Sequence, residues 1–153
     1  MKFGVVVFPG SNCDHDMYYN LKTNLNQKVE FLWHKETSLK KCDFIILPGG
    51  FSYGDYLRSG AIAQFSPIMN SVIEHAKNGG FVMGICNGFQ ILCETNLLPG
   101  TLLRNNNQKF ICRNLYIKSS NSCLLTKEIS SKKTLLIPIA HAEGRYYAEP
   151  KTL

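Results

Sequence analysis

Short apolar runs, each ending at a turn rich in glycine or proline, constrain the fold of this chain more than any other feature. The first run, at 3–8, is continuous and rich in valine, and Pro9-Gly10 ends it. A run without polar alternation is typical of a strand buried on both faces of a parallel sheet. The expected strands are 3–8, 29–33, 43–47 and 81–85, and the expected helices are 17–25, 61–77, with a break near Ser66, and 87–94.

Strands and helices in this order predict an α/β fold, in which a mostly parallel sheet has helices on both faces. Such sheets place their binding sites at the carboxyl ends of the strands. The candidate loops are therefore 9–12, 48–60 and 86–88. Beyond residue 100 the pattern changes, and we expect strands at 109–118 and 134–140 that extend the sheet in an antiparallel direction.

The composition fits one cytoplasmic domain that covers residues 1–153. With 44% hydrophobic and 18% charged residues, the chain can bury a sizeable core. No apolar run approaches the roughly 18 residues that a membrane-spanning helix needs, and the first run is too short for a signal peptide. We therefore expect no contact with a membrane.

The net charge of +6 lies entirely in the last third of the chain. Residues 1–100 hold eight basic and eight acidic side chains, whereas 101–153 hold nine basic and three acidic ones. The basic residues are scattered and do not alternate with aromatic residues, so we expect no nucleic-acid partner. A solvated face is the favoured interpretation, and an acidic partner surface is the alternative.

The six cysteines form neither a Cys-x-x-Cys pair nor a Cys/His spacing that is typical of zinc sites. We therefore expect no bound metal and no disulfide scaffold. Most of the thiols, Cys93 among them, are expected to be small buried side chains.

One cysteine stands in a different setting, the segment Gly84-Ile85-Cys86-Asn87-Gly88. This is the pattern of a nucleophile elbow with cysteine as the nucleophile. The glycines permit a tight turn between strand and helix. The helix N-terminus stabilises a thiolate, and the Asn87 N–H is placed to bind an oxyanion. For this pentapeptide taken alone, a buried cysteine between turn glycines is the alternative.

A glycine-rich segment follows the third expected strand. Consecutive glycines there allow backbone N–H groups to face a cleft and to complete an oxyanion hole, and a flexible surface loop is the alternative. Neither a P-loop nor a dinucleotide-binding motif occurs. The segment reads Pro48-Gly49-Gly50-Phe51-Ser52-Tyr53-Gly54-Asp55-Tyr56-Leu57-Arg58-Ser59-Gly60.

A cysteine nucleophile needs a base. His141 and Glu143 are two residues apart in an expected extended segment, so their side chains point to the same side and form a candidate pair. We interpret His15 and His34 as structural residues and His75 as a surface residue.

Four segments together resemble the class I glutamine amidotransferases, and more narrowly the glutaminase subunits of the phosphoribosylformylglycinamidine synthases of purine biosynthesis. The elbow alone indicates only the superfamily, whereas the segment from Gly49 to Arg58 indicates the narrower family. The similarity runs from the first strand to about Glu149. The four segments are Val7-Phe8-Pro9-Gly10-Ser11-Asn12-Cys13-Asp14, Pro48-Gly49-Gly50-Phe51-Ser52-Tyr53-Gly54-Asp55-Tyr56-Leu57-Arg58, Gly84-Ile85-Cys86-Asn87-Gly88-Phe89-Gln90 and Pro138-Ile139-Ala140-His141-Ala142-Glu143-Gly144.

The resemblance implies that the Cys86 thiolate attacks the side-chain amide of glutamine, that ammonia leaves, and that water then releases glutamate from a thioester. The ammonia would pass to a large synthetase subunit that binds ATP and magnesium. A small accessory subunit is a further expected partner, and this chain is expected to hold no cofactor. The implied site residues are Cys86 as nucleophile, Gly50 and Asn87 as oxyanion hole, and Gly49, Phe51 and Gln90 as substrate-binding residues.

The base pair of this family lies in a His-Pro-Glu segment near the C-terminus, and no such tripeptide occurs here. His141-Ala142-Glu143 matches a different, earlier motif of the family, so the resemblance implies no catalytic role for it. We therefore expect the domain to be incomplete at its C-terminus. A non-catalytic remnant that binds the synthetase is the alternative function.

Overall fold

The computed structural model describes residues 1–119, 123–130 and 132–152. The chain forms two compact units. Unit 1 consists of Met1–Leu102 with Tyr146–Leu153, and unit 2 consists of Leu103–Arg145. None of the helices described is long and apolar enough to cross a membrane.

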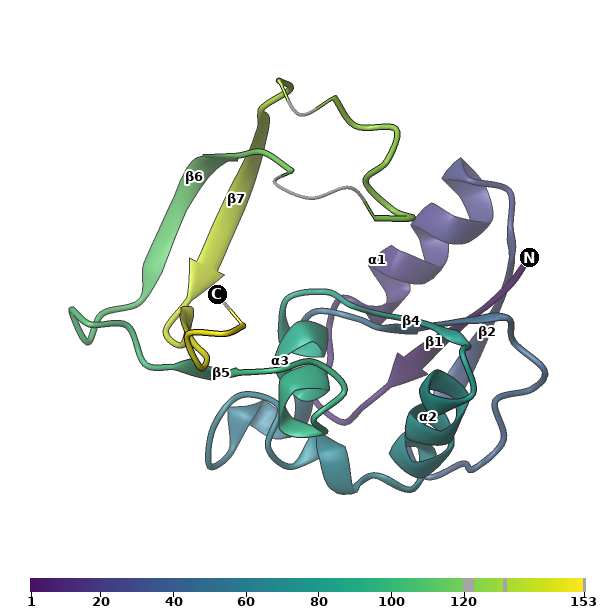
Figure 1. The fold of residues 1–153 in the computed structure, drawn as a ribbon. Helices are drawn as coiled ribbons and strands as arrows, with labels where there is room; N and C mark the ends of the chain where they lie inside the picture. The colour runs from purple at the N-terminus through teal and green to yellow at the C-terminus, as the bar shows by residue number, and fades with distance from the viewer. Residues whose placement is uncertain (120–122, 131, 153) are drawn as a thin grey trace. The chain divides into compact units, whose positions relative to one another are not determined.

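A four-stranded parallel sheet forms the centre of unit 1 (Figure 1). Its strands are β1 (Lys2–Val7), β2 (Lys28–Trp33), β3 (Phe44–Leu47) and β4 (Phe81–Gly84), in the order β2-β1-β3-β4. The register pairs Val5 of β1 with Phe31 on one side and with Ile46 on the other. The predicted mostly parallel sheet is therefore confirmed.

Helices cover both faces of this sheet, as the run pattern predicts. Side chains alternate along each strand, so Val5 and Val6 of β1 belong to two different core clusters. The cluster around Val6 includes side chains of α2 (Pro67–Lys77) and α3 (Asn87–Glu94). The cluster around Val5 includes side chains of α1 (Asp14–Tyr19) and of the π-helical turn Asn20–Asn24 that follows it.

The break expected near Ser66 is also present. A 3₁₀ turn at Ala63–Phe65 ends there, and α2 begins at Pro67, whose fixed φ and missing N–H suit the first turn of a helix. Near the end of α2, the prediction for His75 needs correction. Its ring packs against Gly80 and its Nε2 atom is buried, because the chain turns back over the helix end at Asn78-Gly79-Gly80.

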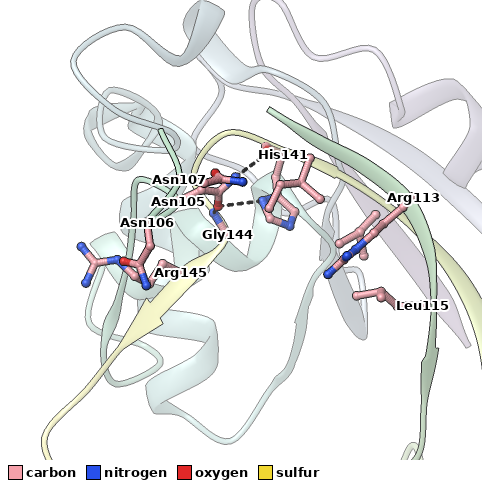
Figure 2. A pocket seen from close by; sticks show the side chains of 10 residues that line it. Asn105, Asn106, Asn107, Arg113, Leu115, His141, Gly144 and Arg145 are labelled. Carbon is pink, nitrogen blue, oxygen red and sulfur yellow. Dashed lines mark hydrogen bonds between the residues drawn. The ribbon is translucent and has the colours of Figure 1, made fainter. Parts of the chain in front are cut away.

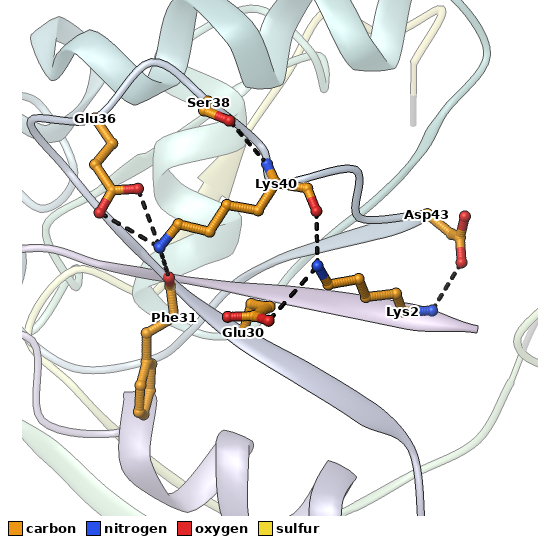
Figure 3. A network of polar contacts seen from close by, with 7 residues as sticks. All are labelled: Lys2, Glu30, Phe31, Glu36, Ser38, Lys40 and Asp43. Carbon is orange, nitrogen blue, oxygen red and sulfur yellow. Dashed lines mark hydrogen bonds and ion pairs between the residues drawn. The ribbon is translucent and has the colours of Figure 1, made fainter.

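The connection between β2 and β3 is tied to the sheet by two lysines (Figure 3). The Nζ of Lys40 donates to the carbonyl of Phe31 at 2.8 Å and pairs with Glu36 at 3.1 Å. The Nζ of Lys2 donates to the carbonyl of Lys40 at 2.7 Å, and the Lys2 backbone N–H donates to Asp43. These bonds fix the amino-terminal edge of the sheet, opposite the strand ends that carry the site.

Unit 2 contains an antiparallel pair, β6 (Ile111–Ile117) and β7 (Leu135–His141), with Leu115 opposite Ile137. Both strands were expected, but the expected extension of the central sheet is wrong. They form a two-stranded sheet of their own. Pro138 in β7 cannot donate to a further strand, which suits an edge position. A second two-stranded sheet, most of whose residues belong to unit 1, joins β5 (Thr101–Leu103) and β8 (Arg145–Tyr147).

Candidate functional site

Three loops that follow β1, β3 and β4 meet at Cys86. A methyl group added at Gly49 would lie 3.4 Å from the Cβ of Cys86 and 3.6 Å from the Sγ of Cys13. The Ser11 hydroxyl lies 3.4 Å from the carbonyl of Gly49, and the Tyr53 N–H donates to the carbonyl of Pro9 at 2.6 Å. The carboxyl edge of the parallel sheet therefore brings together the segments that the sequence singled out.

Cys86 occupies a strained turn between β4 and α3. It has φ 52° and ψ −109°, a conformation that costs a residue with a Cβ of order 1–3 kcal/mol, and its side chain is exposed. It also caps α3, since its carbonyl accepts from the N–H groups of Phe89 and Gln90 at 3.0 and 3.2 Å. An exposed thiol at the start of a helix is the geometry that the elbow motif predicts.

The two glycines of the elbow are required by close approach. A Cβ at Gly84 would lie 2.5 Å from the carbonyl oxygen of Gly88, and a Cβ at Gly88 would overlap the carbonyl oxygen of Leu47. Both obstacles are backbone atoms, which cannot turn aside as a side chain can. The elbow therefore packs directly on β3 and is held rigidly above the sheet.

The expected oxyanion donors lie on two of the three loops. Asn87 is the first residue of α3, where a backbone N–H has no acceptor within its own helix. Gly50 has φ +126°, and a Cβ there would lie 2.7 Å from the Oδ1 of Asn12. The donor roles of both N–H groups stay predictions.

The side chain of Asn87 forms a network that the sequence did not reveal. It is 2% exposed. Its Oδ1 accepts from the Ser52 N–H at 3.0 Å, and its Nδ2 donates to Asp55 at 3.1 Å and to Gln90 Oε1 at 3.0 Å. The signal in the sequence was a polar residue inside an otherwise apolar strand-to-helix turn, but its partners are distant along the chain.

The loop held by Asn87 has an unusual backbone. Tyr53, Asp55 and Leu57 all have positive φ, at 54°, 53° and 70°.

The side chain of Tyr53 extends from this loop to His34 and Ser66. Its hydroxyl lies 2.8 Å from His34 Nδ1 and 2.9 Å from Ser66 Oγ. Burial, and secondarily Lys35, lowers the pKa of His34, so this imidazole is neutral at pH 7 and has a structural position.

Cys13 is a second thiol at the site, and the sequence did not single it out. Burial raises its pKa, and Asp16, Cys86 and Asp14 raise it further. The Cys13 thiol therefore stays protonated at neutral pH, which argues against a nucleophilic role for Cys13.

Two further features flank the elbow. The substrate-binding candidate Phe51 is 49% exposed. Arg58 forms a two-pronged ion pair with Glu94 at the end of α3, with N–O distances of 2.8 and 2.6 Å. The ion pair joins the far end of the glycine loop to the helix that begins at the nucleophile.

His141 belongs to unit 2. Its Nδ1 lies 3.1 Å from the Oδ1 of Asn105, a buried residue whose Nδ2 donates to the carbonyls of Lys109 and His141. An open pocket of about 410 Å³ in unit 2 includes His141, with Arg113 and Arg145 among its other lining residues (Figure 2). Glu143 is not among the residues that line this pocket, and the pairing of His141 with Glu143 stays a prediction.

A parallel α/β sheet with an exposed cysteine at a strand-to-helix elbow, beside a glycine loop, places the chain in a structural class of α/β proteins in which such a cysteine is a candidate nucleophile. Comparisons with known proteins narrow this class. The family model described as CobB/CobQ-like glutamine amidotransferase domain matches residues 1–153. Among curated relatives, the "Phosphoribosylformylglycinamidine synthase subunit PurQ" of Salinibacter ruber is 53% identical over 99% of this chain, and that of Trichormus variabilis is 54% identical over 100%.

Solved structures agree with these relatives. A structure of PurLQS from Thermotoga maritima matches 97% of this chain and 69% of its own, with 43% identity and a TM-score of 0.88. A structure described as a putative GMP synthase protein from Thermoplasma acidophilum, at 15% identity and TM-score 0.61, shares the fold. The chain belongs to the CobB/CobQ-like glutamine amidotransferase family, within the branch of phosphoribosylformylglycinamidine synthase PurQ subunits. It spans 65% of the relatives from Salinibacter ruber and Moorella thermoacetica.

Proposed function

We propose that this chain is the glutaminase part of a phosphoribosylformylglycinamidine synthase. The Cys86 sulfur attacks the side-chain amide carbon of glutamine, and the carbonyl oxygen becomes an oxyanion. Collapse of this adduct breaks the C–N bond as the amide nitrogen takes up the proton that the Cys86 thiol lost, so ammonia leaves and a γ-glutamyl thioester remains. Water then attacks the thioester, glutamate leaves, and the thiol is restored.

The observation that carries this proposal is the exposed, strained Cys86 at the edge where three loops meet. Backbone N–H groups of Gly50 and Asn87 are the proposed oxyanion donors, and preorganised donors of this kind stabilise the transition state by about 2.7–4 kcal/mol each. Gly49, Phe51 and Gln90 are the proposed contacts to glutamine. Gln90 is suited to this role because Asn87 fixes its amide at the first turn of α3.

The proposed partner is a large synthetase subunit that consumes the ammonia and binds ATP and magnesium, with a small accessory subunit beside it. The similarity to a chain of the PurLQS structure supports an assembly of this kind. The proposed chain has no cofactor of its own and acts in the cytoplasm. His141 and Glu143 receive no role in the proposal.

Replacement of the nucleophile tests the proposal. In the chain assembled with its synthetase partner, Cys86→Ala should lower glutamine-dependent synthesis at least about 10³-fold, whereas synthesis from added ammonia should persist. Cys93→Ala, which removes a buried thiol on the same helix, is the matched control and should retain activity. If Cys86→Ala still hydrolyses glutamine, the proposal is wrong.

The alternative is a non-catalytic module that binds the synthetase. These 153 residues contain no His-Pro-Glu segment, the place where the resemblance puts the base pair. Loss of general acid–base help lowers a rate on the order of 10²–10⁴-fold. Glutamate release by the 153-residue chain mixed with its partner should therefore be low. Robust turnover that disappears in His141→Ala would instead make His141 and Glu143 the working base pair.

A further inference from the structure

We infer that the side chain of Asn87 is a positioning residue that locks the glycine loop onto the nucleophile elbow and so sets the distance between the two halves of the oxyanion hole. This inference rests on the proposed function. The inference goes beyond the proposed function because that mechanism gives a role only to the backbone N–H of Asn87 and none to its side-chain amide.

The first support is the way the Asn87 amide is used. An asparagine side chain can accept at its oxygen and donate twice from its nitrogen. Here the oxygen accepts from the Ser52 N–H, while the nitrogen donates to Asp55 and to Gln90. One buried side chain therefore binds the glycine loop at two points and the helix once.

The second support is the strain of the loop between those points. Tyr53 and Asp55 adopt the left-handed region, which costs a residue with a side chain roughly 1–2 kcal/mol. Such a backbone persists only where its surroundings hold it in place. The two Asn87 bonds, at Ser52 and Asp55, bracket this strained stretch.

The third support is the position of the bracketed segment relative to the chemistry. Ser52 lies two residues after Gly50, the proposed oxyanion donor, and Asn87 directly follows Cys86. A shift of the Ser52 anchor would therefore move the Gly50 N–H relative to the thiol. Because oxyanion donors act only when they lie 2.7–3.1 Å from the developing charge, a small shift removes their effect.

Asn87→Asp tests the inference with the smallest change of shape. Aspartate keeps an acceptor for the Ser52 N–H but loses both donated bonds and faces the Asp55 carboxylate across 3.1 Å. Amide exchange of the peptide covering 50–57 should become about 10-fold faster, because one of the two lost bonds, the buried bond to Asp55, holds this peptide. Asn78→Asp, at the exposed end of α2, adds the same charge and should leave this peptide unchanged.

A pair of thiol reagents separates positioning from a general structural role. A glutamine analogue that carries an aldehyde in place of the side-chain amide forms an oxyanion when Cys86 attacks its carbonyl carbon, whereas iodoacetamide alkylates the thiol without one. In the chain assembled with its partner, Asn87→Asp should slow the first reaction about 10-fold or more and change the second less than about 3-fold. Equal slowing of both reagents, or unchanged exchange at 50–57, would overturn the inference.

The reciprocal variant Asn87→Asp/Asp55→Asn restores a donor opposite an acceptor. It should return the exchange of 50–57 to within about 3-fold of the original chain, and failure to do so would count against the Asn87–Asp55 bond as the lock. The exchange measurement does not depend on catalysis. If Cys86→Ala retained activity, the proposed function would fail, while the exchange result would still show whether the Asn87 side chain holds the glycine loop on the elbow.

Discussion

Units 1 and 2 contrast in how their strands are buried. In unit 1, Val5, Val6, Ile45 and Leu47 are at most 3% exposed, because helices cover both faces of the parallel sheet. In unit 2, the described strands β6 and β7 leave large apolar side chains open, with Tyr116 74% and Leu136 52% exposed. A parallel sheet needs cover on both faces, whereas an antiparallel pair tolerates one or two open faces.

This difference explains where the candidate site lies. The candidate nucleophile Cys86 lies in a strained backbone that needs a rigid support, and the packed edge of unit 1 supplies it. Gly88 contacts the backbone of β3, and Arg58 and Asn87 join the loops to α3. The polar cluster of unit 2, by contrast, is built around a single buried residue, Asn105.

Truncation of one apolar strand side chain in each unit sharpens the contrast most. Ile45→Ala removes a fully buried side chain of the sheet and should lower the free energy of unfolding by about 3 kcal/mol, within the 2–5 kcal/mol range for such changes. Leu136→Ala in β7 removes a half-exposed side chain and should cost about 0.5 kcal/mol or less. Urea denaturation of both variants measures the difference, and equal losses would contradict the contrast.

Methyl groups added at two glycines should have the next largest effects on the free energy of unfolding. Gly88→Ala meets the backbone carbonyl of Leu47 and should destabilise unit 1 by about 2 kcal/mol, because the backbone has to move. At Gly144→Ala in unit 2, the nearest atoms belong to the ring of His141, a side chain that can shift more easily than backbone, so we expect less than about 1 kcal/mol. Thermal melts check the order, and a larger loss for Gly144→Ala would reverse it.

The smallest expected effect is a difference in the pH at which two thiols, one in each unit, become reactive. Burial raises the pKa of Cys13, whereas hydrogen bonds from Thr126 and from the backbone lower the pKa of Cys123. Because the thiolate is the reactive form, alkylation of Cys123 by iodoacetamide should begin at a lower pH than that of Cys13.

Peptide mapping of the alkylated protein between pH 6 and pH 10 measures this order. Thr126→Val removes the hydroxyl that bonds to the Cys123 thiol, which should shift the Cys123 profile to higher pH and leave Cys13 unchanged. A Cys13 profile at or below that of Cys123 would show that burial is not the dominant influence on the two thiols.

Much of unit 1 followed from local sequence patterns. The apolar runs gave the four strands to within a residue or two, and Pro67 gave the start of α2. Gly84 and Gly88 located the turn at Cys86, because a strand-to-helix turn without room for a Cβ needs glycine at those positions. Patterns of this kind act over a few residues and need no knowledge of the rest of the fold.

The structure of unit 2 was predicted less well from the sequence. The strands were expected at their observed places, but their pairing with the central sheet was not found. The sequence pattern of a strand is the same whether the strand pairs within a large sheet or with a single neighbour. Periodicity shows which face is apolar, but it does not show what covers that face. His75 was misjudged for a similar reason, because its burial depends on how Gly80 returns over it.

The sequence by itself determined the order of strands and helices along the chain and the position of the elbow that holds the candidate nucleophile, since both depend on apolar periodicity and on backbone freedom within single segments. Only the tertiary structure decided which distant groups meet there. The Asn87 amide bonds to Ser52, 35 residues earlier, and Cys13 lies across Gly49 from Cys86. Parallel strands bring their carboxyl ends to one edge whatever the length of chain between them, so contacts made at that edge leave no pattern in the sequence.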